Sequence, residues 1–373
     1  MNRFLLVLSS LLLTTTLFIP VLHAADRSSS GLPLERIQLP PGFHISLFAA
    51  NVENARSMAW NGKDTLYVGT RREGSVYALI DSDGDYQVDK RYVIADDLSM
   101  PNGIVYHQGD LYVAEVNRIL KYKNIDSHKH QSPEPLVIYD GLPDESHHGW
   151  RYLNLGPDNR LYVSIGAPCN ICDEKDYAVI ARLNLDGSGF EIIARGIRNS
   201  VGFSWHPETK ELWFTDNGRD MLGDDLPPDE LNRVTEIGQH FGYPYCHGGF
   251  LLDPEYGEGK TCSNYVAPEQ KLAPHAASLG LHIYSGRQFP ESYKGNIFIA
   301  EHGSWNRSKK IGYRISLVKL KNNKAVAYEN FATGWLRNES AWGRPVDIKP
   351  LPDGSLLVSD DKANAIYRIY YRP

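Results

Sequence analysis

Short strand-like segments recur in pairs along the chain. In each pair, a turn leads into a short run of apolar or aromatic residues such as Leu-Tyr-Val, and a polar loop leads to a second segment with alternating side chains. The first members of the six pairs begin at Asp64, Asp110, Arg160, Glu211, Asn296 and Ser355, and the second members at Ser75, Arg118, Val179, Glu230, Gly312 and Ala365. Successive pairs are about 45 to about 85 residues apart, which suits propeller blades with loop insertions. The pattern predicts an all-β fold, a six-bladed β-propeller.

One strand-like segment near the N-terminus belongs to no repeat. The sequence FHISLFA, beginning at Phe43, has strand patterning but no partner of its own. A propeller must close its ring or leave an open sheet edge. We therefore expect this segment to be the outer strand of the blade that ends at Tyr370, within a single propeller domain that covers residues 39–373.

The N-terminus has the pattern of an export signal. Arg3 precedes an apolar run over residues 4–22, and the small residues Ala24 and Ala25 follow it. These features predict a signal peptide at 1–25, followed by a leader at 26–38. A retained membrane anchor is the alternative, because the run is near the minimum length of a span. We expect a periplasmic or secreted protein without stable membrane insertion.

Net charge and cysteine content bear on whether the protein binds nucleic acid and whether it contains disulfides. The 373 residues carry a formal net charge of -6, which offers no basic footprint for nucleic acid. The four cysteines, Cys169, Cys172, Cys246 and Cys262, form an even set in an exported chain and predict two disulfides, with three possible connectivities. A zinc site is the alternative, but only one pair has the Cys-x-x-Cys spacing.

The loops beside the repeated strands carry the candidate chemistry. Corresponding connections of a propeller gather at one end of its central channel, and these connections differ from blade to blade. They contain HHGWR at 147–151, RN at 198–199, DNGRD at 216–220, EHGSWNR at 301–307 and GRP at 343–345. Arginine offers bidentate recognition of carboxylates and planar stacking. The set predicts a pocket for a planar anionic ligand.

These motifs, in this order and spacing, resemble the soluble pyrroloquinoline-quinone-dependent sugar dehydrogenases, especially their sorbosone or pyranose dehydrogenase branch. The resemblance runs from LPPGF at 39–43 to GRPVD at 343–347. It implies a quinone and a calcium ion (Ca2+) in the pocket. The glucose-oxidising branch differs in having a lysine at the position of His302 and an arginine at that of Val346.

The resemblance also implies roles for individual residues. His147 would take the proton of a sugar hydroxyl while hydride passes from that carbon to the quinone. Arg198 and Asn199 match a pair that lies over the quinone, where Arg198 would stabilise developing negative charge. The backbone carbonyls of Gly218 and Arg219 would bind the calcium.

Further residues are implied to contact the quinone. Arg344 matches an arginine that binds a quinone carboxylate, and Arg71 and Asn102 are pocket members on a weaker match. His302 and Trp305 occupy positions where the sorbosone or pyranose branch uses a histidine and a tryptophan. His148, next to His147, is an alternative for the base.

A second acidic segment lies outside this set. Asp81, Asp83, Asp85 and Asp89 surround a glycine in the manner of calcium loops, although the closing glutamate of such loops is missing. A solvated acidic hairpin is the alternative interpretation.

The resemblance therefore implies a dehydrogenase that depends on pyrroloquinoline quinone (PQQ) and calcium, oxidises an aldose or related hydroxy-aldehyde and passes electrons to an external acceptor. Two other functions stay open. One is a calcium-dependent lactonase-type hydrolase, which would need several inward carboxylates or asparagines on one ion. The other is a non-catalytic propeller that binds a partner or a glycan.

Overall fold

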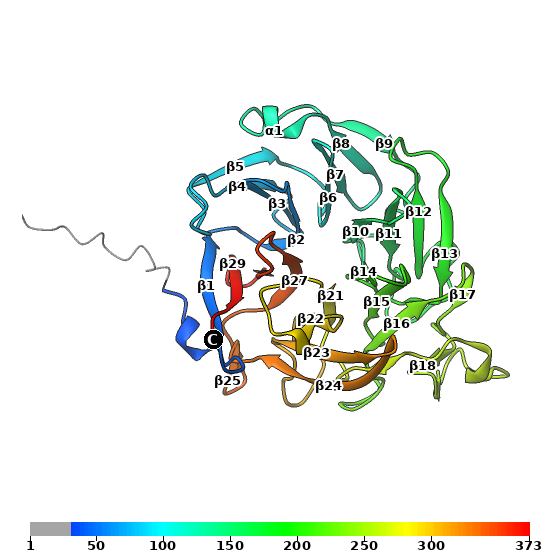
Figure 1. The fold of residues 1–373 in the computed structure, drawn as a ribbon. Coiled ribbons are helices and arrows are strands. Elements are labelled where there is room, and N and C mark those ends of the chain that lie inside the picture. Colours follow the sequence, from blue (N-terminus) through cyan, green and yellow to red (C-terminus); the bar gives the residue numbers. More distant parts are fainter. Residues whose placement is uncertain (1–30) are drawn as a thin grey trace, which may run out of the picture. The chain divides into compact units, whose positions relative to one another are not determined.

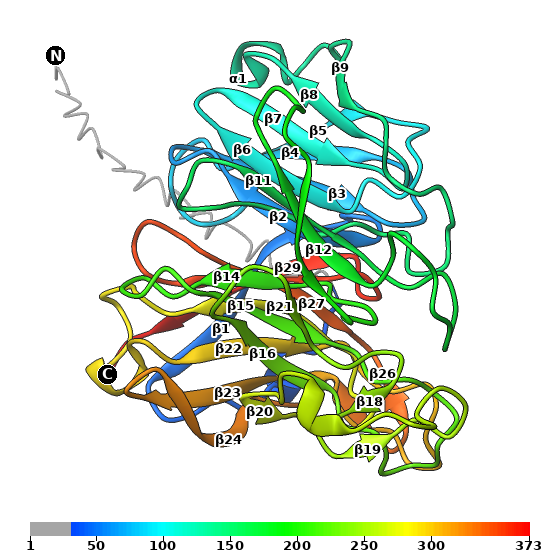
Figure 2. The same cartoon turned by 90° about the vertical axis from the view of Figure 1, so that its right-hand side faces the viewer.

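The computed structural model describes residues 31–373, in which Pro33–Pro373 form one unit. Six sheets, each built on four antiparallel strands, follow one another around this unit in sequence order (Figure 1). Within a blade, successive strands lie side by side, as β22, β23 and β24 do in Figure 2. The predicted six-bladed propeller is confirmed.

Each blade begins with an innermost strand and ends with an outermost one. The first blade has β2 (Ala55–Trp60), β3 (Thr65–Thr70), β4 (Val76–Ile80) and β5 (Lys90–Ala95). The second has β6 (Gly103–His107), β7 (Asp110–Ala114), β8 (Ile119–Tyr122) and β9 (Leu136–Tyr139). The third has β10 (Leu153–Leu155), β11 (Leu161–Ile165), β12 (Val179–Leu183) and β13 (Glu191–Arg195).

The remaining blades follow the same order. The fourth has β14 (Phe203–Trp205), β15 (Leu212–Asp216), β16 (Glu230–Val234) and β20 (Gln270–Lys271). The fifth has β21 (Ser278–Ile283), β22 (Ile297–Glu301), β23 (Arg314–Lys321) and β24 (Lys324–Ala332). The sixth has β27 (Pro345–Pro350), β28 (Leu356–Asp360), β29 (Ala365–Tyr371) and β1 (Phe43–Ala50).

Short helices and strands lie outside the four-stranded repeats of the blades. They are η1 (Leu34–Arg36), α1 (Ile125–His128), β17 (Gln239–His240), η2 (Cys262–Asn264), η3 (Glu291–Tyr293) and two hairpins, β18 (Cys246–His247) with β19 (Leu251–Leu252) and β25 (Leu336–Arg337) with β26 (Ser340–Ala341). Of these, β17 pairs in parallel with β13 and extends the third sheet. Among the described residues, no helix is long and apolar enough to span a bilayer.

Burial explains why the second strand of each blade gave the clearest signal in the sequence. Every residue of β3, β11, β15, β22 and β28 is buried, because both faces of these strands pack against neighbouring blades. Such strands have nearly continuous apolar sequences. In the outer strand β5, in contrast, Lys90, Arg91 and Val93 are exposed and only Ile94 is buried. The core therefore lies between the blades rather than at one centre.

The N-terminal strand closes the ring as predicted. β1 pairs antiparallel with β29, from Phe43 opposite Tyr371 to Ala50 opposite Ala365. The chain enters the fold before residue 39, since the amide of Gln38 donates to the Thr333 carbonyl at 2.8 Å. The predicted signal peptide at 1–25, and the predicted leader as far as residue 30, lie outside the described residues.

The four cysteines form the two predicted disulfides, and the structure selects one of the three connectivities. Cys169 is bonded to Cys172, and Cys246 to Cys262. No described cysteine is free.

Candidate functional site

The loops that carry the predicted site meet at one end of the channel because of strand register. Ala55 pairs with Thr70, Ser278 with Glu301, and Pro345 with Asp360. The residues that enter an innermost strand therefore lie beside those that leave the second strand of the same blade. Together these loops enclose a cavity of about 480 Å³.

The cavity lining combines five arginines and four histidines with two carboxylates. The lining residues are Arg56, Arg71, Arg72, Met100, Ser146, His147, His148, Trp150, Arg198, Asn199, Asn217, Gly218, Asp220, Asp229, His275, Ala277, Leu279, His302, Gly303, Trp305 and Arg344. A cavity of this composition suits an anionic ligand. Of the two carboxylates, that of Asp220 already pairs with Arg198 at 3.1 Å.

Most of the predicted site residues meet in this cavity. His147, Arg198, Arg71, Asn199, His302, Trp305, Arg344 and Gly218 all line it. Asn102 does not line it and is completely buried. The side chain of Arg219 is also absent from the lining, and its guanidinium pairs with Asp253 at 2.6 Å and with Glu255 at 3.1 Å.

Two of the predicted arginines, Arg71 and Arg344, have no carboxylate partner within residues 31–373. The guanidinium carbon of Arg71 lies 3.5 Å from the centroid of the Trp150 ring, and its Nε is buried without a hydrogen-bond partner. Within residues 31–373, neither Arg71 nor Arg344 forms an ion pair. Burial and the nearby Arg56 lower the pKa of Arg71 to about 9. An anionic ligand would relieve this unbalanced charge.

His302, which lines the cavity, belongs to a buried network in the cavity wall. Its Nε2 lies 2.8 Å from Asp361 Oδ1, and Arg56 Nη1 donates to the other carboxylate oxygen at 3.0 Å. Burial lowers the pKa of His302 to about 4, and Asp361 offsets this only in part. The neutral ring therefore donates from Nε2 to Asp361. Arg56 Nε in turn donates to Asn102 Oδ1 at 2.9 Å, so Asn102 supports the cavity wall from behind.

Arg198 is held by the protein through all of its N–H groups. Nε donates to the Asn170 carbonyl at 2.9 Å, and Nη2 donates to Asn170 Oδ1 at 2.9 Å and to Asp220 at 3.1 Å. Nη1 donates to the carbonyls of Asn217 at 3.3 Å and Gly218 at 3.0 Å. The guanidinium therefore brings positive charge to the cavity and fixes the turn that carries the predicted calcium ligands.

The two adjacent histidines differ in environment. His147 is exposed to the cavity, and burial together with Arg198 lowers its pKa below 6.5. His148 is buried, and its Nδ1 lies 2.8 Å from the Ala167 carbonyl, which makes Nδ1 the protonated nitrogen. Its pKa falls well below 6.5 through burial and the charge of Arg198. Both residues line the cavity, and His147 is the more exposed of the two.

Sequence reasoning missed several residues of the site. Asp229 is buried and accepts from the amides of Gly218 at 3.1 Å and Ser278 at 2.9 Å. His275 Nε2 lies 2.9 Å from the carbonyls of Gly223 and Leu226, and its buried Nδ1 has no hydrogen-bond partner but lies 3.9 Å from Asp220 Oδ1. Arg56 is a charged residue that is buried within the innermost strand β2. That single charge in a core strand was the one available signal.

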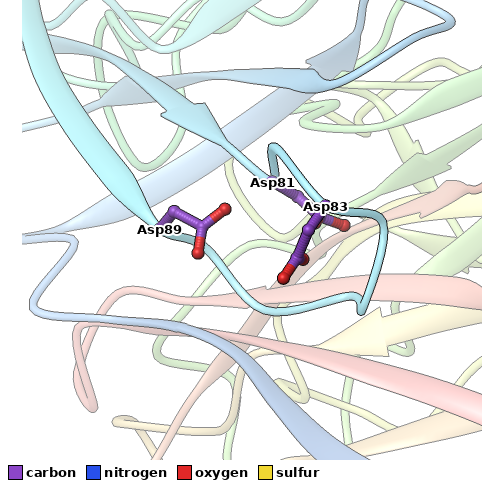
Figure 3. Close-up of side chains that lie close together, drawn as sticks. All are labelled: Asp81, Asp83 and Asp89. Carbon is purple, nitrogen blue, oxygen red and sulfur yellow. The ribbon is translucent and has the colours of Figure 1, made fainter.

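The acidic segment after β4 lies apart from the cavity. Ligand oxygens of Asp81, Asp83 and Asp89 lie within 4.8 Å of one another (Figure 3). Asp81 accepts from the amides of Gly84 at 2.8 Å and Tyr86 at 3.0 Å, while Asp89 accepts from the amide of Ser82 at 2.8 Å. These bonds hold the carboxylates of Asp81 and Asp89 within the hairpin, and Asp83 accepts from the amide of Asp85 at 3.2 Å.

The comparisons with known proteins place the chain in a family. An uncharacterised protein of Borreliella burgdorferi is 37% identical over 392 residues, covering 99% of each chain. The iodide structure of a Trichoderma reesei protein of carbohydrate-active enzyme family AA12 shares 20% identity at a TM-score of 0.79, over 90% of this chain and 98% of that one.

A second solved structure with the same fold is that of a PQQ domain. The holo form of the pyranose dehydrogenase PQQ domain of Coprinopsis cinerea shares 18% identity at a TM-score of 0.76, over 90% of this chain and 97% of that one. The model of the TrAA12-like family matches residues 37–372. The match covers nearly all of the described propeller, and the chain belongs to the TrAA12-like family.

Proposed function

We propose that this protein is an exported dehydrogenase that uses pyrroloquinoline quinone and calcium to oxidise an aldose or a related hydroxy-aldehyde. The observation that carries the proposal is the pair of unpaired guanidinium groups, Arg71 and Arg344, in one cavity with the exposed ring of His147. The quinone of the Coprinopsis cinerea relative supports the same assignment.

The donor set of the cavity fits this cofactor. Pyrroloquinoline quinone is a planar tricarboxylate, and the cavity volume of about 480 Å³ lies in the usual range for small-molecule sites. Arg71 and Arg344 would bind its carboxylates, and the buried, unpartnered Nε of Arg71 would gain an acceptor. When bound, the quinone supplies the acceptor for the hydride of the substrate.

The residues of the chain would then prepare the substrate for that transfer. At neutral pH the ring of His147 is unprotonated, because its pKa is lowered below 6.5, so it can take the proton of a sugar hydroxyl. The buried ring of His148 would hold the loop through its bond to the Ala167 carbonyl. Arg198 would add electrostatic stabilisation of negative charge without breaking its bonds to the protein.

The turn at 217–220 fits a calcium site that the protein completes only in part. The Gly218 carbonyl accepts one bond from Arg198, which leaves a second lone pair for a cation. A Cβ at Gly218 would lie 2.8 Å from the Pro228 carbonyl, so the turn has no room for a larger residue. Calcium takes about six to eight oxygen ligands. The carbonyls of Gly218 and Arg219 alone would not suffice, and quinone and water oxygens would complete the sphere.

The proposal includes the location of the enzyme outside the cytoplasm and an external electron acceptor. Two disulfides are typical of proteins from oxidising compartments, which supports a periplasmic or secreted enzyme. The electrons would leave to an external acceptor.

The test is a titration of the purified protein with the quinone, with and without Ca2+, followed by dye reduction with a panel of aldoses. We expect saturable quinone binding that weakens when Ca2+ is removed with a chelator, and dye reduction only with both present. Arg344→Gln should weaken quinone binding, whereas Lys324→Gln, a matched change of an exposed cation on β24, should not. Absence of quinone binding at micromolar concentrations would overturn the proposal.

A further inference from the structure

The Cys169–Cys172 disulfide closes a short ring at the wall of the candidate site. The two cysteines are three positions apart, with Cα atoms 6.2 Å from each other, and Asn170 and Ile171 lie between them. The Cys172 amide donates to the hydroxyl of the buried Tyr243 at 3.0 Å, which fixes one end of the ring to the adjoining loop.

Asn170, inside this ring, holds two residues of the site. Its carbonyl and its Oδ1 each accept from Arg198 at 2.9 Å. Its Oδ1 also accepts from the Asp220 amide at 2.8 Å, and its Nδ2 donates to the Asp220 carbonyl at 3.2 Å. One side chain therefore fixes both the guanidinium of Arg198 and the backbone of Asp220.

These contacts continue into the turn with the proposed calcium ligands. Arg198 reaches the Gly218 carbonyl at 3.0 Å, and Asp220 pairs with Arg198 at 3.1 Å. The residues 217–220 are thus held from the disulfide ring through Asn170. A group that orients the ligands of a site typically changes its affinity by about tenfold to a hundredfold.

We propose that the Cys169–Cys172 disulfide positions Asn170 against Arg198 and Asp220, and that reduction of this disulfide loosens the turn at 217–220 and weakens ligand binding. Asn170 is a positioning residue, since its bonds go to Arg198 and Asp220. The ligand assignment rests on the proposed function, whereas the link between the disulfide and the turn rests on the hydrogen bonds alone.

The ring is accessible to a reductant. Both cysteines are half-buried, and Cys172 lines a separate cavity of about 140 Å³. A dithiol such as dithiothreitol would transfer two electrons and two protons, breaking the S–S bond to give two thiols while the dithiol closes to its own cyclic disulfide.

The second disulfide provides a matched control. Cys246–Cys262 spans a sequence separation of 16, and loop entropy makes such a cross-link more important for global stability than a ring across a separation of 3. Loss of the small ring should therefore mainly affect the site, and loss of the larger one mainly the thermal midpoint.

The experiment compares Cys169→Ser/Cys172→Ser with Cys246→Ser/Cys262→Ser, and Asn170→Ala with Asn170→Asp. Hydrogen exchange at the amides of residues 217–220 is measured without quinone, and the Kd for pyrroloquinoline quinone is measured with Ca2+. A third arm follows the same exchange after dithiothreitol treatment of the wild type. The Asp220 amide is the direct probe, because Asn170 Oδ1 is its acceptor.

We expect Cys169→Ser/Cys172→Ser, dithiothreitol treatment and Asn170→Ala to accelerate exchange of the Asp220 amide. The Cys169→Ser/Cys172→Ser variant and Asn170→Ala should each raise the Kd for pyrroloquinoline quinone by about tenfold to a hundredfold. Asn170→Asp keeps the acceptor for Arg198 and the Asp220 amide but loses the donor to the Asp220 carbonyl, so it should restore only part of the protection and affinity. The control pair should lower the thermal midpoint more than it changes the exchange of 217–220.

Unchanged exchange at Asp220 in Asn170→Ala would overturn the inference, even if the cysteine variant did not fold. Faster exchange in both disulfide variants alike would do so as well, because it would reflect general loosening. If the wild type binds no quinone, the proposed function fails, while the exchange measurements still decide the role of the disulfide.

Discussion

The guanidinium of Arg71 lies 3.5 Å above the ring of Trp150, with no carboxylate partner among the described residues. A cation held in this way favours an anionic, planar ligand. Arg71→Gln should therefore raise the Kd for pyrroloquinoline quinone by about tenfold or more, the usual value of one charge-assisted bond. Isothermal titration with the quinone in the presence of Ca2+ measures this change.

The same variant should not weaken the ligand-free protein. Burial lowers the pKa of Arg71 to about 9, below its ordinary 12.5, so its charge opposes folding at neutral pH. The thermal midpoint of Arg71→Gln at pH 7 should equal or exceed that of the wild type. A large drop would mean that Arg71 serves the fold rather than a ligand.

His147 should set the acid limb of the pH profile. Burial and Arg198 lower the pKa of His147, so the neutral form of the base persists below pH 6.5. The value of kcat/KM should be constant above neutral pH and should fall only in acid, as the ring gains a proton. His147→Asn should reduce kcat by about a hundredfold to ten-thousandfold and leave the quinone Kd unchanged.

His148 provides the comparison for that experiment. Its buried ring donates to the Ala167 carbonyl, so His148→Asn should alter loop stability and affinity more than the position of the acid limb. If turnover persists in His147→Asn and the acid limb disappears in His148→Asn, then the base is His148.

Local sequence patterns were sufficient for the fold because the signal of a strand is local. The buried strands β3 and β28 appear as short apolar runs, and their repetition gave the blade count and the closing role of β1. The site loops were also recognisable, since register brings the entries and exits of each blade to one end.

The partners of individual side chains could not be predicted in the same way. Arg56 pairs with Asp361 across 305 positions in the sequence, a contact that only ring closure creates. Likewise, the family resemblance implied an Arg198 facing a ligand, but not that Asn170 and the 217–220 turn would engage all of its donors. Hydrogen bonds between loops of different blades depend on the assembled ring, and no periodicity encodes them.

The buried pair Arg56 and Asp361 should contribute strongly to stability. Their side chains are 2% and 9% exposed, and their nearest charged atoms are 3.0 Å apart. Asp361→Asn would leave the guanidinium buried without its counter-ion, which typically costs about 3–5 kcal/mol. The free energy of unfolding in urea measures this loss.

An exposed pair supplies the matched control. Lys319 and Glu329 are 44% and 45% exposed, so Glu329→Gln should cost less than about 1 kcal/mol of the free energy of unfolding.

The contribution of Asp361 to stability should depend on pH. Burial would raise the pKa of Asp361, but His302 and Arg56 together hold it below its ordinary 3.8. Its stabilisation is therefore complete above pH 4 and is lost as the pH falls further toward the folded-state value. Equal losses in the two variants would contradict this account.

The closing strand should depend on the aromatic ring of Phe43. This ring is 7% exposed and makes edge contacts with Phe289, Phe331 and Tyr371, with centroids 4.8, 5.0 and 5.1 Å away. Phe43→Ala should lower the free energy of unfolding by about 3–5 kcal/mol, because β1 would lose its anchor between the fifth and sixth blades. Val326→Ala, at a site that is 59% exposed on β24, should change it by no more than about 0.5 kcal/mol. If Phe43→Ala proved as mild as Val326→Ala, the pairing of β1 with β29 would not depend on this ring, and the backbone ladder alone would close the propeller.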